Sequence, residues 1–148
     1  MQKILLILGL LLWAQSAAAL EISITELNRY EGDINQCGEF IDPDENLPAD
    51  DYFTRINYAE RVQECYVNLA VKIFERYYRK KPDVTIRNMH DLRDMLRTRY
   101  SEANEHSIFC KPSCGTKEAL YTARNVTYGM ETYLRSVVDA LRRRKSAE

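Results

Sequence analysis

The chain has few of the residues that usually build an active site or a strand-rich fold. Its 148 residues include two histidines, five glycines and four prolines. It contains no glycine-rich phosphate loop and no G-x-S-x-G or H-E-x-x-H motif. No segment alternates apolar and polar residues as a β-strand does, and no paired carboxylates stand in an apolar setting that would raise a pKa. We therefore expect neither an enzyme nor a cofactor-binding protein.

An excess of charge of one sign is also missing. Lys and Arg together number 21, against 22 for Asp and Glu. No cluster of basic residues forms the footprint of a nucleic-acid-binding protein, so nucleic acid is not expected as a partner. Beyond the first 19 residues, no apolar run approaches the ~20 residues that a membrane-spanning helix needs.

Residues 1–19 have the order of a cleavable secretory signal peptide. Lys3 supplies the positive charge, residues 4–14 form an apolar run, and Ala17-Ala18-Ala19 is a small-residue cleavage site. The run is too short to serve as a membrane anchor. We expect cleavage after Ala19, which leaves residues 20–148 as a single helical domain in the periplasm or outside the cell.

The four cysteines all follow the expected cleavage site, at positions 37, 65, 110 and 114. An even number in a small exported chain predicts two disulfides. In one arrangement Cys65 pairs with Cys110 or Cys114, and Cys37 takes the remaining partner. In the other, Cys37 pairs with Cys65 and Cys110 with Cys114. Spacing alone leaves both arrangements open.

Apolar residues recur at helical spacing in four segments. A capping box, Ser23-x-x-Glu26, begins the first segment, and Pro82 is expected to end the second. Because four helices with short connections pack as neighbours of opposite direction, the sequence predicts an all-α, antiparallel four-helix bundle. The expected helices cover about residues 23–37, 51–81, 86–103 and 116–143.

One cluster has the composition of a metal site. His106, Cys110 and Cys114 have the spacing H-x3-C-x3-C, which on a continuous helix would place ligands for zinc or copper on one face. Pro112 and Gly115 argue against a continuous helix there, and disulfides are the expected state of these cysteines after export. No metal is therefore expected, and a metal or small-ligand carrier remains an alternative.

Aromatic residues next to basic ones give two candidate interfaces, because such residues anchor protein contacts. One patch combines Tyr77, Tyr78 and Arg79. The other consists of Tyr121 and Tyr128, on the outer side of the last expected helix. The alternative is that these rings cover the edge of the core and keep their hydroxyls in water.

The sequence Asn125-Val126-Thr127 is an N-glycosylation sequon. Asn125 is expected to point away from the apolar stripe of the last helix and to be exposed. The sequon is used only if the host is a eukaryote.

The expected function is protein–protein binding by an exported helical module. In general appearance the chain is similar to small periplasmic immunity or inhibitor proteins of bacteria, which would act by binding another protein. A similar general likeness to four-helix cytokines gives the alternative of a secreted signalling ligand. No sequence motif supports either likeness.

Overall fold

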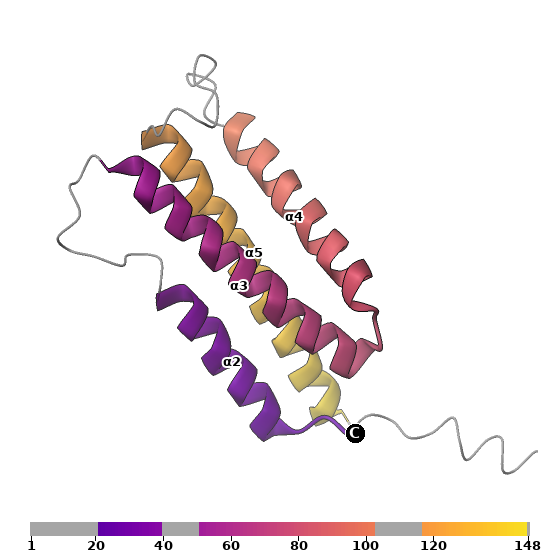
Figure 1. Ribbon diagram of the computed structural model, residues 1–148. Coiled ribbons are helices and arrows are strands. Elements are labelled where there is room, and N and C mark those ends of the chain that lie inside the picture. The colour runs from indigo at the N-terminus through magenta and orange to yellow at the C-terminus, as the bar shows by residue number, and fades with distance from the viewer. Residues whose placement is uncertain (1–20, 40–50, 103–116, 148) are drawn as a thin grey trace, which may run out of the picture.

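The computed structural model describes residues 21–39, 51–102 and 117–147. These residues form four α-helices and no strand: α2 (Ile24–Gly38), α3 (Tyr52–Tyr78), α4 (Pro82–Glu102) and α5 (Lys117–Ser146). Successive helices alternate in direction (Figure 1). The predicted all-helical bundle is confirmed.

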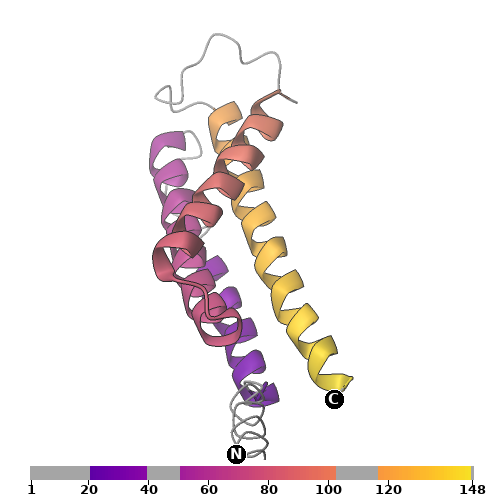
Figure 2. The ribbon, with the colours of Figure 1, turned by 90° about the vertical axis from the view of Figure 1, so that its right-hand side faces the viewer.

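The two longest helices, α3 and α5, run parallel to each other in the middle of the bundle. Each of them packs against the other and against both α2 and α4. Figure 2 looks onto α4, which crosses in front of α3 and α5, while α2 lies behind them. The bundle therefore has a central pair of helices with one outer helix on each side.

The core forms where the apolar stripes of all four helices meet. Burying a large aliphatic or aromatic side chain contributes roughly 1.5–3 kcal/mol, so these stripes supply most of the driving force for folding. Side chains with no more than 2% exposure come from every helix: Leu27, Ile34, Tyr66, Ile73, Met89, Met130, Leu134 and Leu141.

A buried polar contact fixes the position of α3 along α5. Gln63 Nε2 donates to Thr127 Oγ1 at 3.1 Å and to the Ala123 carbonyl at 3.2 Å. The Thr127 hydroxyl in turn donates a hydrogen bond to the same carbonyl at 2.9 Å. Because a buried amide N–H group left without an acceptor is costly, sliding one helix along the other would carry a penalty that apolar contacts alone do not impose.

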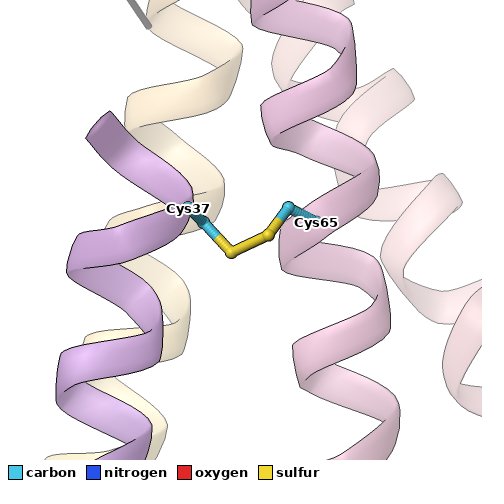
Figure 3. Close-up of a disulfide and its surroundings, with 2 residues drawn as sticks. All are labelled: Cys37 and Cys65. Atoms are coloured by element: carbon cyan, nitrogen blue, oxygen red, sulfur yellow. A yellow bond between two sulfur atoms is a disulfide. The ribbon is translucent and has the colours of Figure 1, made fainter. Parts of the chain in front are cut away.

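The Cys37–Cys65 disulfide joins the end of α2 to the middle of α3 (Figure 3). This bond confirms one of the two pairings that the spacing left open. The other arrangement, in which Cys65 bonds Cys110 or Cys114, is wrong, because Cys37 lies next to Cys65 across the α2–α3 contact. Cys110 and Cys114 lie outside the described residues.

The boundary between the second and third helices differs from the predicted one. The predicted helix continues to residue 81, whereas α3 ends at Tyr78 because Arg79 adopts a left-handed conformation with φ 51°. The next helix was expected from residue 86 but already begins at Pro82. Proline suits the first helical position, where its missing N–H has no helical partner to lose. Pro82 thus begins a helix rather than ending one.

Ion pairs tie the outer helices to the central pair. Most connect exposed or half-exposed groups, so each contributes only about 0–1 kcal/mol. Three of them connect different helices: Glu26 of α2 with Arg76 of α3 (3.3 Å), Glu31 of α2 with Arg142 of α5 (2.9 Å) and Glu64 of α3 with Arg93 of α4 (2.8 Å).

Glu26→Gln is expected to destabilise the protein at neutral pH but not in acid. Burial alone would raise the pKa of Glu26, but the Tyr77 hydroxyl, the Arg76 guanidinium and the Tyr30 hydroxyl together hold it below its ordinary value of 4.5. Since the folded pKa is the lower one, the carboxylate stabilises the fold above pH 4.5, and this stabilisation is lost as the pH falls through the folded pKa. We expect a loss of about 1 kcal/mol or less near neutral pH.

Urea unfolding of the Glu26→Gln variant and the wild type, repeated from about pH 7 to about pH 2, measures this difference. Glu75→Gln is the matched control, because Glu75 is an exposed glutamate on α3. A deficit for Glu26→Gln that stays constant over the whole pH range would contradict the role given to its charge.

Candidate functional site

A groove opens where the first turns of α3 and α5 lie together at one end of the bundle, with a volume of about 540 Å³. Figure 1 shows the two helix starts beside each other at the upper end of the molecule. The buried side chain of Leu120 gives the groove an apolar part. The remaining lining side chains are aromatic or charged: Tyr52, Arg55, Lys117, Glu118, Tyr121 and Arg124.

Local structure places the α3 residues of this groove. Asp51 caps α3, and its carboxylate accepts a hydrogen bond from the Thr54 N–H at 3.1 Å. The hydrogen bond from the backbone N–H of Thr54 lowers the pKa of Asp51 below its ordinary value of 3.8 and so favours the charged form of the cap. With the helix started at this point, Tyr52 and Arg55 fall within its first turn and line the groove from the α3 side.

The α5 residues share one face of their helix because of their spacing. Lys117, Tyr121 and Arg124 are separated by four and then three residues, which places them above one another on an α-helix. Tyr128 follows four residues later and continues the line. We call these four residues the α5 face.

The groove carries an excess of positive charge. Arg55, Lys117 and Arg124 supply three cations, against the carboxylate of Glu118 in the groove and that of Asp51, which interacts electrostatically with Arg55. Because α3 and α5 run parallel, the amino ends of both helices lie here, and each adds the positive end of its dipole. The site therefore attracts groups with negative charge, and its tyrosine rings offer hydroxyl donors and flat apolar faces.

Comparison with known protein families, characterised proteins and solved structures finds no match. A function must therefore be inferred from the chemistry of the surface itself. No described helix is long and apolar enough to cross a membrane. Within the same ranges, no three His, Cys, Asp or Glu side chains come together as metal ligands do. The predicted trio His106, Cys110 and Cys114 lies outside them.

The two predicted aromatic patches have different positions in the structure. Tyr121 and Tyr128 are largely exposed, at 57% and 70%. Tyr77 is instead a core residue, because its ring packs edge-on against Tyr30 at 6.2 Å between centroids. Of its neighbours, Tyr78 is partly exposed and its ring packs at a tilt against Phe74, and Arg79 is the C-cap of α3.

The sequon residues are less accessible than expected. Asn125 is half-buried rather than exposed. Thr127 is fully buried, where its hydroxyl takes part in the contact between α3 and α5. Thr127 is therefore a core residue of this fold, whether or not Asn125 is glycosylated.

Tyr121 of the groove was predicted from the sequence, whereas the charged residues that line the groove were not. Lys117 and Arg124 share the helical spacing of Tyr121 and Tyr128, so the pattern K-x3-Y-x2-R-x3-Y was available as a signal. Tyr52 and Arg55 gave no such signal, because nothing in the sequence places the start of α3 beside the start of α5.

Proposed function

We propose that this protein is an exported protein-binding module that contacts its partner through the α5 face. The observation that carries the proposal is the pair Tyr121 and Tyr128, whose rings are largely exposed on the same line of the helix as Lys117 and Arg124. Tyrosine and arginine are the residues that most often dominate binding energy at interfaces. Rings so far outside the core contribute little to folding, which leaves binding as the function they serve best.

The double substitution Tyr121→Ser and Tyr128→Ser is expected to abolish binding and leave the fold intact. The test is chemical cross-linking of the protein in the extracytoplasmic fraction of the cells that make it, followed by identification of the cross-linked partner. Loss of two aromatic anchors, each worth about 2 kcal/mol or more, would weaken binding at least a hundredfold.

Met95→Ser is the matched control, because Met95 is 60% exposed but lies on α4. A partner that is captured equally well by the wild type and by both variants would exclude the α5 face as its binding surface.

Export and a second disulfide belong to the same proposal. The residues at the start of the chain support export, and the Cys37–Cys65 bond leaves Cys110 and Cys114 as the remaining pair. The protein purified for the cross-linking experiment should then begin at Leu20 by intact mass. All four of its cysteines should resist alkylation. A thiol that reacts before reduction would contradict the second bond.

A further inference from the structure

We propose that the groove between α3 and α5 receives an acidic segment of the protein partner, held by Lys117 and Arg124 and flanked by Tyr52 and Tyr121. This inference rests on the proposed binding function and adds the chemistry of the partner. Its starting point is the groove itself, which combines local positive charge with aromatic walls.

The positive charge of the groove is a local feature and not a property of the whole surface. The chain has a formal net charge of −1, yet the residues that line the groove include three cations and a single carboxylate. Charge complementarity of this kind steers a partner of opposite charge and fixes its orientation. An acidic segment is the partner that this charge pattern fits.

A peptide segment fits the groove better than nucleic acid does. Nucleic acid binding usually draws on more phosphate contacts than three cations can supply. The rings of Tyr52 and Tyr121 and the apolar side chain of Leu120 can also cover the backbone and methylene groups of a peptide.

The test is fluorescence anisotropy of a fluorescein-labelled hexaglutamate peptide with the full mature protein at low salt. Lys117→Glu combined with Arg124→Glu is expected to weaken binding about tenfold or more, and added salt should weaken binding to the wild type. Lys72→Glu combined with Arg87→Glu is the matched control. It changes the net charge equally, at exposed positions on α3 and α4 that do not line the groove.

Lys117→Gln serves as a milder variant, because Lys117 is exposed at the start of α5 and its replacement leaves the core untouched. It should weaken hexaglutamate binding severalfold. Equal weakening by the groove and control pairs would overturn the inference, as would tighter binding of a labelled single-stranded oligonucleotide. Binding that appears only after Asp42, Asp44, Glu45 and Asp50 are neutralised would also overturn it, because the occupant would then be the chain's own acidic segment.

The cross-linking experiment separates this inference from the proposed function. Suppose that the Lys117→Glu, Arg124→Glu variant still captures the partner while the Tyr121→Ser, Tyr128→Ser variant does not. The proposal of an acidic segment is then wrong, and the proposed binding function stands. Loss of capture with both pairs, together with retention by the control pair, supports both proposals.

Discussion

Removing the Cys37–Cys65 bond, by Cys37→Ala and Cys65→Ala together, is expected to lower the free energy of unfolding by about 3–4 kcal/mol. The two cysteines are 28 residues apart in sequence. Without the bond, the unfolded chain regains the entropy that closure of this loop removes, and the entropy estimate for a loop of this size gives that figure. Urea unfolding of the oxidised wild type and the variant measures the difference.

The ion pairs of α2 do not replace this bond. Arg76 and Arg142 pair with glutamates of α2, but their side chains are 44% and 34% exposed. Ion pairs of such exposed groups contribute little to stability. Cys110→Ala with Cys114→Ala is the control, because the proposed bond between them would close a loop of only a few residues and would contribute less, roughly 2 kcal/mol. A Cys37→Ala, Cys65→Ala variant as stable as the wild type would show that apolar packing alone holds α2.

The course of the helices could be predicted from the sequence because each helix buries a continuous stripe. Leu134 and Leu141 on α5 stand at helical spacing and are both buried, so periodicity and packing agree there. The boundary between α3 and α4 was missed for a local reason. The left-handed conformation of Arg79 leaves no signal in a residue type that rarely adopts it, and proline is compatible with both the end and the start of a helix.

The candidate site was only half predictable for a reason that lies in tertiary structure. Tyr121 and Tyr128 belong to one helix, and helical spacing shows that they share a face. The groove depends on α3 and α5 being parallel neighbours, which no local pattern encodes. The same limit applied to the cysteines, because the choice of Cys65 as the partner of Cys37 depends on how α2 packs against α3.

The second large effect on stability is expected from substitution of Gly129, where α5 contacts Leu96 of α4. A Cβ atom at this position would lie 2.8 Å from Cδ1 and 3.0 Å from Cδ2 of Leu96. Leu96 is only 9% exposed and belongs to the core, so its side chain has little room to move away. Gly129→Leu is therefore expected to push the helices apart and to lower the free energy of unfolding by about 2 kcal/mol, even though leucine favours a helix more than glycine does.

Gly32→Leu is the matched control for Gly129→Leu, because a Cβ atom at Gly32 would meet nothing within 4 Å. Here the same substitution in a helix is expected to raise the free energy of unfolding by about 0.5–1 kcal/mol. Because both variants gain helical propensity, the difference between their urea-unfolding free energies isolates the contact with Leu96. Adding Leu96→Ala should recover part of the loss in the Gly129→Leu variant, since the two side chains would share one space. If both leucine variants stabilise the protein equally, α4 does not pack closely against α5 at Gly129, and this outcome would contradict the helix arrangement described above.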